Sequence, residues 1–337
     1  MYTDWSALRS VTGAFLAALV ASVLLTRVVL SIARRRELRQ QEREDGPATH
    51  LTKQGTPSLG GLALVPAIVL AAAAVLLPHY GPERFGASPA LLVLAVGALF
   101  ALLGLADDWA KVRGGDSRGV KARWRILIEI GLAAGFVCLL RVPAGDSSWG
   151  FGALVSGLGP YGDLLWRALG VFVVVGAANA VNFTDGVDGL AATTVAIWGG
   201  VLALALLFTG NPAYAALAAA ITGGAAGFLW FNSNKAKIFM GDVGSLGLGA
   251  LMGALAVITD LQWFLALSGV VFIVEVLSVV LQVTYFRATK GKRLFRMTPI
   301  HHAFELRGWS EPQLVARFAI IGLAAGGLAL MLFGYYT

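Results

Sequence analysis

Five aspartates fall in three short stretches that each border a long apolar run. Asp107 and Asp108 follow one such run, Asp185 and Asp188 lie between two others, and Asp242 directly precedes a further one. Mg²⁺ prefers oxygen ligands and usually binds through one or two carboxylates together with substrate phosphates. The grouping therefore predicts a site for a metal-bridged diphosphate. Capping of a helix end is the alternative for any single aspartate, but the recurrence in three stretches favours the metal site.

Other polar residues near these aspartates suit a phosphate ligand. Lys111 and Asn182 lie close to them in the sequence, and the glycine-rich stretch 55–61 precedes an apolar run. Backbone N–H groups in such a stretch can approach an anion at the start of a helix. A basic segment near the C-terminus contains His301 and His302, whose neutral imidazoles can hydrogen-bond a phosphate or a base. A pair of solvated loop histidines is the alternative.

Long uncharged stretches must position these residues. Of the 337 residues, 57% are apolar and 13% are charged, against roughly 25% charged in soluble domains. A helix needs about 20 apolar residues to cross a bilayer, and ten stretches approach that length. We therefore expect an all-α polytopic membrane protein with about ten transmembrane helices, or nine if the short fourth stretch does not cross. The stretches are approximately 10–32, 59–77, 89–106, 126–140, 164–181, 189–208, 213–230, 243–258, 263–284 and 317–335.

The distribution of basic residues predicts the orientation. Most of the 26 Lys and Arg residues lie in alternate loops, which the positive-inside rule places in the cytoplasm, with both termini in the periplasm. No connection is long enough for a soluble domain, so residues 1–337 are expected to form one membrane domain with catalytic cytoplasmic loops. Those loops are 33–58, 107–125, 182–188, 231–242 and 285–315.

Charge and cysteine content exclude other kinds of site. The net charge of +7 is mostly an orientation signal, and no basic soluble domain exists to bind nucleic acid. Cys138 is the single cysteine, so the chain can form neither an internal disulfide nor a cysteine-based metal site.

Five stretches between residues 50 and 305, with Gly308, Trp309 and Glu311 after them, resemble the phospho-N-acetylmuramoyl-pentapeptide transferases, a branch of the polyprenyl-phosphate N-acetylhexosamine-1-phosphate transferases. The fifth stretch points to this branch, although Ala303 stands where the family usually has a third consecutive histidine. The stretches are 50–61 (HLTKQGTPSLGG), 107–111 (DDWAK), 179–190 (NAVNFTDGVDGL), 240–245 (MGDVGS) and 295–305 (FRMTPIHHAFE).

The resemblance implies a reaction and a place for it. It implies a Mg²⁺-dependent enzyme of the bacterial cytoplasmic membrane, acting as a homodimer with its active site facing the cytoplasm. Undecaprenyl phosphate would attack UDP-MurNAc-pentapeptide to give lipid I and UMP. Asp242 matches the family's magnesium ligand, Asp107 and Asp108 match its essential acidic pair, and Lys111 completes the catalytic set. Substrate contacts are implied for Lys53, Ser58, Lys111, Asn182, Asp185, Gly186, Val187, Asp188, Asn232, Phe239, Ser245, Gln282, His301 and His302.

Two mechanisms fit these residues. The acceptor is a phosphomonoester with a second pKa of about 6, so it is largely a dianion at neutral pH and can attack directly. Asp107 would then orient the acceptor or take its last proton, and Asp108 would support the metal and phosphate arrangement. The rival mechanism passes through a covalent aspartyl-phosphate.

Two other functions are compatible with parts of the sequence. A related transferase could use a UDP-GlcNAc-type donor, although stretch 295–305 argues against it. A transporter could use the intramembrane acids Glu129 and Glu275, because such residues are costly in lipid and usually functional. Transporters, however, place their sites near the bilayer midplane between repeats, whereas the aspartates here gather at one face.

Overall fold

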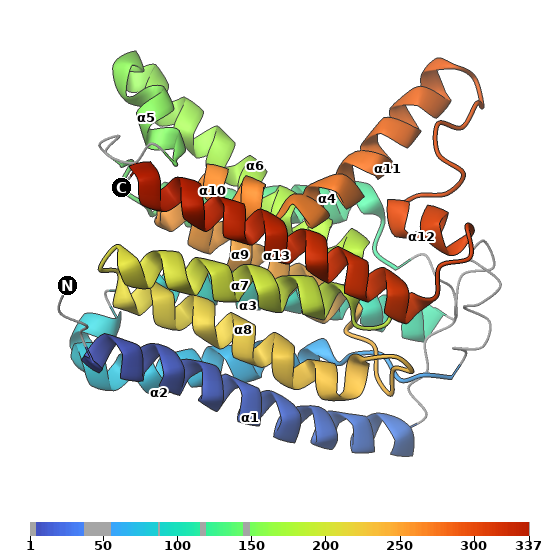
Figure 1. The fold of residues 1–337 in the computed structure, drawn as a ribbon, viewed down its shortest axis with the longest axis horizontal. Helices are drawn as coiled ribbons and strands as arrows, with labels where there is room; N and C mark the ends of the chain where they lie inside the picture. The colour runs from blue at the N-terminus through green and yellow to red at the C-terminus, as the bar shows by residue number, and fades with distance from the viewer. Residues whose placement is uncertain (1–4, 37–54, 87, 115–118, 144–148, 337) are drawn as a thin grey trace.

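The computed structural model describes residues 5–36, 55–86, 88–114, 119–143 and 149–336 (Figure 1). These residues form α-helices and one 3₁₀ turn (Ser156–Leu158) and contain no strand element, which confirms the all-α prediction. The helices are α1 (Trp5–Arg35), α2 (Gly61–Gly86), α3 (Pro89–Gly114), α4 (Ala122–Cys138), α5 (Phe151–Val155), α6 (Pro160–Thr184), α7 (Leu190–Phe208), α8 (Pro212–Asn232), α9 (Gly241–Ile258), α10 (Gln262–Ser268), α11 (Val270–Ala288), α12 (Ile300–Glu305) and α13 (Glu311–Tyr336).

The apolar stretches correspond to helices, with two differences. Within the described ranges, nine helices are long and apolar enough to cross a membrane, and the chain is a multi-pass membrane protein. The short fourth stretch forms α4, which has 17 residues. The predicted ninth span, 263–284, is divided at Gly269 into α10 and α11; a Cβ at this position would lie 2.6 Å from the Leu265 carbonyl oxygen, so the chain passes close to the end of α10 there.

Helix α9 lies at the centre of the bundle. Every residue from Val243 to Val257 is buried, and its glycines let neighbouring backbones approach closely, as small residues do in membrane helices. A Cβ at Gly249 would overlap the Ala177 carbonyl of α6, and one at Gly61 would overlap the backbone of Gly244. This packing holds the start of α9 between α2, α3 and α6, so Asp242 in its first turn is placed among three helices.

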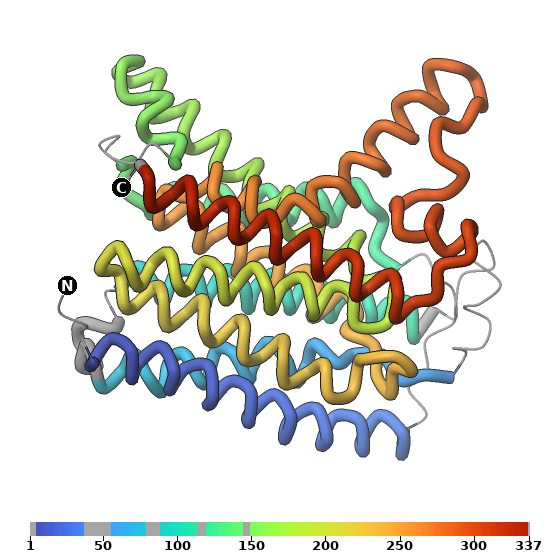
Figure 2. Tube along the Cα trace, viewed as in Figure 1, coloured from blue at the N-terminus to red at the C-terminus, as the bar shows by residue number. Residues whose placement is uncertain are grey.

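The two ends of the bundle differ. Figure 1 shows α1 beginning and α13 ending at the same end of the bundle. Connections 55–60, 233–240 and 289–299 lie at the opposite end, where α12 also packs. Figure 2 shows that α11 leans away from the bundle toward this second end. These three described connections, which belong to loops predicted to carry the chemistry, therefore share one end of the molecule.

Candidate active site

Three carboxylates meet where α3 ends and α9 begins. Asp107 and Asp108 on α3 and Asp242 on α9 each offer an oxygen atom, and these atoms lie within 4.8 Å of one another. Glycine makes the approach possible, since a Cβ on Gly104 would overlap the Asp242 carbonyl. Gly241 has φ +72°, a value that disfavours other residues, and a Cβ there would lie 2.6 Å from Asp108 Oδ2.

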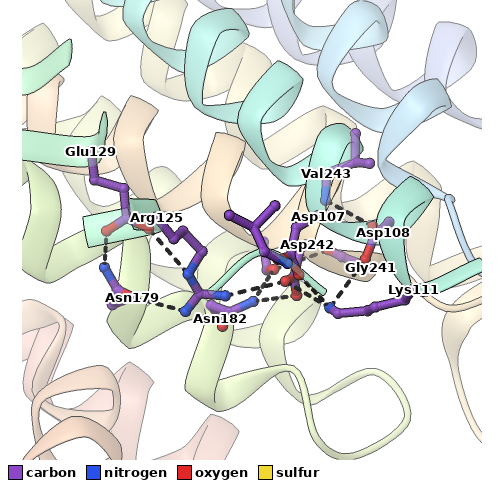
Figure 3. A network of polar contacts seen from close by, with 12 residues as sticks. Asp107, Asp108, Lys111, Arg125, Glu129, Asn179, Asn182, Gly241, Asp242 and Val243 are labelled. Atoms are coloured by element: carbon purple, nitrogen blue, oxygen red, sulfur yellow. Dashed lines mark hydrogen bonds and ion pairs between the residues drawn. The ribbon is translucent and has the colours of Figure 1, made fainter. Parts of the chain in front are cut away.

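Lys111 contacts all three carboxylates (Figure 3). Its Nζ lies 2.6 Å from Asp107 Oδ2, 3.5 Å from Asp108 Oδ1 and 2.9 Å from Asp242 Oδ2. The two α3 contacts follow from helix geometry, because residues three and four positions apart share a face. A single cation therefore lies at the point where the three negative charges converge.

The three aspartates differ in exposure and partners. Asp107 and Asp108 are 2% and 4% exposed; Asp107 accepts the Val120 N–H at 2.7 Å, and Asp108 accepts the Val243 N–H at 3.2 Å. Asp108 thus joins the end of α3 to the first turn of α9. The side chain of Asp242 is 15% exposed and is the most accessible carboxylate of the three.

Asp242 also receives donors from two other helices. Asn182 of α6 donates to Asp242 Oδ1 at 2.8 Å and to Ser245 Oγ at 2.9 Å. Arg125 of α4 donates to Asp242 Oδ2 at 3.3 Å. Helices α3, α4 and α6 therefore each direct a donor at this carboxylate, and two of the donors, Lys111 and Arg125, are cations.

Arg125 links the site to a buried acid. Its guanidinium donates to Asn179 Oδ1 at 3.4 Å and lies 3.5 Å from Glu129 Oε1, while Asn179 Nδ2 donates to Glu129 Oε2 at 2.5 Å (Figure 3). Glu129 is 0% exposed, so its charge is balanced within the protein. The sequence indicated an unusual acid at position 129 but not its partner. Arg125 contributed to the sequence analysis only as one of the basic residues that predict the orientation in the membrane.

A second polar cluster joins α11, α12 and the loop after α6. Glu275 Oε2 lies 3.1 Å from His301 Nδ1, His301 Nε2 lies 3.3 Å from His302 Nε2, and His302 Nδ1 lies 2.7 Å from Glu305 Oε2. A Cβ on Gly186 would overlap His301 Nε2. The histidine pair therefore lies against the loop that begins one turn after Asn182, and Glu275 is its buried anchor.

Several other predicted contact residues have structural partners. Asp188 Oδ2 accepts the Ala236 N–H at 2.9 Å, and Asn232 Oδ1 accepts the Gly189 N–H at 3.2 Å. Gln282 Oε1 accepts the N–H groups of residues 294 and 295 at 3.0 and 2.8 Å. Val187 is packed in a small apolar cluster with Leu190. Their substrate contacts stay predictions.

The stretch before α2 lies beside the start of α9. The Phe239 N–H donates to the Pro57 carbonyl at 2.9 Å, and the Gly60 N–H donates to the Phe239 carbonyl at 2.9 Å. Ser58 is 5% exposed; its Oγ has no hydrogen-bond partner among the described residues and would lie 3.1 Å from a Cβ on Gly241. A buried hydroxyl is thus available beside Asp108. Asp185 caps α6, and Lys53 lies outside the described residues.

The donor set suits a hard divalent cation. The three ligand candidates are all carboxylates, and hard divalent cations prefer oxygen ligands. In the structure the Lys111 ammonium group contacts all three carboxylates. The cluster therefore attracts positive charge, as a cation site must. Asp242 is the accessible candidate ligand, and Asp108 holds its helix in place.

Comparison with known proteins identifies the family. The family described as Glycosyl transferase family 4 matches residues 90–260. Three curated relatives are named phospho-N-acetylmuramoyl-pentapeptide-transferase. The one from Desulforudis audaxviator is 41% identical over 322 residues, 93% of this chain and 95% of the relative.

The relative from Thermodesulfovibrio yellowstonii is 39% identical over 315 residues, covering 87% of this chain and 84% of its own length. The relative from Synechococcus is 41% identical over 307 residues, covering 89% and 85%. The chain is therefore a transferase that belongs to the phospho-N-acetylmuramoyl-pentapeptide-transferase family.

Proposed function

We propose that this enzyme transfers phospho-MurNAc-pentapeptide from UDP-MurNAc-pentapeptide to undecaprenyl phosphate, releasing UMP and forming lipid I. The observation that carries the proposal is the convergence of Asp107, Asp108 and Asp242 on Lys111 at one end of the bundle. Phosphoryl transfer depends mostly on positioning and charge neutralisation, and this arrangement offers both.

The reaction brings together two anionic substrates, which need nearby positive charge. Lys111 and Arg125 lie 2.9 and 3.3 Å from Asp242 Oδ2, so both cations can reach a diphosphate held beside that carboxylate. Asn182 fixes the other oxygen of Asp242. The site therefore combines a carboxylate for a metal with two cations and an amide for phosphate oxygens, and such fixed groups stabilise charge without reorganising.

Mg²⁺ is the proposed cofactor, with Asp242 as its ligand and Asp108 as the residue that keeps Asp242 in place. When bound, the ion would supply Lewis-acid stabilisation of charge on the diphosphate. The protein's contribution is the fixed geometry of α3 against α9, which depends on Gly104 and Gly241.

Asp107 is the residue proposed to meet the acceptor. It already holds Lys111 and the Val120 N–H, so it can orient the attacking phosphate through Lys111. Little proton abstraction is required, because the acceptor's second pKa is about 6. A covalent aspartyl-phosphate on Asp107 would need this buried carboxylate to leave both partners.

The end of the bundle that carries the site is proposed to face the cytoplasm, with both termini in the periplasm. Connections 233–240 and 289–299, which carry six Lys and Arg residues, lie at that end, and the positive-inside rule assigns such connections to the cytoplasm. The homodimer implied by the resemblance stays a prediction; crosslinking in native membranes, followed by sizing of the solubilised protein, would test it.

The direct test measures UMP release by purified protein given UDP-MurNAc-pentapeptide and undecaprenyl phosphate, with and without Mg²⁺. We expect magnesium-dependent turnover that Asp242→Asn abolishes. Asp163→Asn, which removes a 58%-exposed carboxylate in the first turn of α6, is the matched control and should keep wild-type activity. Turnover with UDP-GlcNAc but not with the muramoyl donor would refute the proposal.

A further inference from the structure

The turn after α11 is strongly basic. Residues 287–296, called the basic tip below, contain five cations and no acid. All five are exposed, and none takes part in an ion pair with an acidic residue within the described ranges. They are Arg287, Lys290, Lys292, Arg293 and Arg296.

The helix that carries this tip presents apolar side chains to its surroundings. Leu277, Val280 and Leu281 are 47–51% exposed, and Tyr285 and Phe286 near the tip are 38% and 45% exposed. Figure 2 shows α11 diverging from the bundle. Where a helix leaves a bilayer, apolar residues are typically followed by aromatic residues and then by basic ones. The end of α11 has this order. The basic tip is therefore placed at the membrane surface.

The tip has a defined shape. The Gly291 N–H donates to the Phe286 carbonyl at 2.9 Å, and Gly291 has φ +115°, which glycine adopts readily. Gln282 then accepts the N–H groups of Leu294 and Phe295 at 3.0 and 2.8 Å. These contacts hold the returning chain against α11, so the cations move with the helix.

The same helix also holds the histidine pair. Glu275 accepts from the ring and the backbone N–H of His301, at 3.1 and 3.5 Å, and His301 lies against Gly186. The tip continues directly into α12, which carries both histidines. A force that shifts the end of α11 will therefore shift His301 relative to the loop after α6.

We propose that the basic tip binds the headgroups of anionic phospholipids, and that this contact keeps α11 and the histidine pair in their working positions. Each Lys or Arg near an anionic surface strengthens binding about fivefold, so removing three charges should weaken binding about a hundredfold. The interaction falls off within a Debye length, so salt should weaken it too. The link to activity rests on the proposed function.

The test compares K290Q/K292Q/R293Q with R34Q/R35Q/R36Q. The control triplet lies at the exposed end of α1, has three cations and belongs to a helix far from α12 in the sequence. Retained phosphatidylglycerol is measured by native mass spectrometry. UMP release is measured in phosphatidylcholine vesicles containing increasing proportions of phosphatidylglycerol.

We expect the KM for the UDP-linked donor to fall, for wild type and for the control, as the proportion of phosphatidylglycerol rises. The tip variant should bind this lipid about a hundredfold more weakly and lose the response, while keeping wild-type turnover in detergent. Equal effects of the two triplets would overturn the proposal.

Two further results would reassign the tip. Loss of UDP binding by the tip variant in detergent would make it part of the nucleotide site. If added undecaprenyl phosphate lowered the KM in the same way as phosphatidylglycerol does, the basic tip would be part of the acceptor site. If the protein retained phosphatidylglycerol through the tip but turned over none of the tested donors, the lipid contact would be supported and the proposed function would be refuted.

Discussion

Replacing Arg125 by Met removes two interactions at once. It takes away one of the two cations at Asp242 Oδ2, and it leaves Glu129, which is 0% exposed, with Asn179 as its remaining side-chain partner. The first loss should reduce catalysis and the second should reduce stability. The two effects can be separated, because a second substitution can repair only one of them.

The magnitudes follow from burial. Removing one partner of a buried ion pair costs about 3–5 kcal/mol; the Arg125 side chain is 19% exposed and Asn179 still donates to Glu129, so we expect the lower end, about 3 kcal/mol. Losing one preorganised donor at a developing charge lowers kcat about 10²–10³-fold. Adding Glu129→Gln to Arg125→Met removes the uncompensated charge and should restore most of the stability.

The assay pairs thermal unfolding in detergent with magnesium-dependent UMP release. We expect R125M to be about 3 kcal/mol less stable with kcat lowered about 10²–10³-fold, and R125M/E129Q to be nearly as stable as wild type with kcat still lowered. Activity that returns together with stability in the double variant would refute the reasoning, because Arg125 would then serve Glu129 alone and contribute nothing at Asp242.

Three further predictions concern the two polar clusters. Asp242→Asn should lower kcat about 10²-fold or more, measured as UMP release across a Mg²⁺ titration; a normal response would exclude it as a ligand. Gly186→Ala, whose Cβ would displace His301, should lower kcat/KM roughly tenfold or more, whereas Gly176→Ala, on the preceding helix α6, meets open space and should change nothing. Glu275→Gln should lower kcat more than about tenfold because His301 loses its orienting carboxylate; an effect on stability alone would contradict this.

The bundle could be predicted from the sequence because a membrane span is recognised by length and apolarity alone. Hydropathy does not indicate where a helix is interrupted, so the division at Gly269 was missed. The meeting of Asp107, Asp108 and Asp242 was predicted because aspartates are rare and bordered apolar runs, but the predicted group also held Asp185 and Asp188, which are not in the cluster. Arg125 was missed because nothing in local spacing shows that a cation near the start of α4 points at Asp242 on α9, 117 residues later.

Other polar contacts between residues distant in the sequence were also missed. Glu275 was recognised as an intramembrane acid, but its partner His301 is 26 residues away and belongs to a separate short helix. Only the tertiary packing of α11 against α12 reveals the pair. Gln282 was expected to contact the substrate, and its observed contact with the backbone of residues 294 and 295 depends on a turn that periodicity does not predict.

The shortness of α4 has a consequence for the surrounding bilayer. As the predicted fourth span, its 17 residues would extend about 26 Å at 1.5 Å per residue, against a hydrocarbon thickness of about 30 Å, and its N-terminal half carries Arg125 and Glu129. Such hydrophobic mismatch is relieved when the membrane thins locally. Lipids with longer acyl chains would resist that thinning and would favour a different position of α4, the helix that supplies Arg125. The geometry of the active site would then depend on the thickness of the membrane.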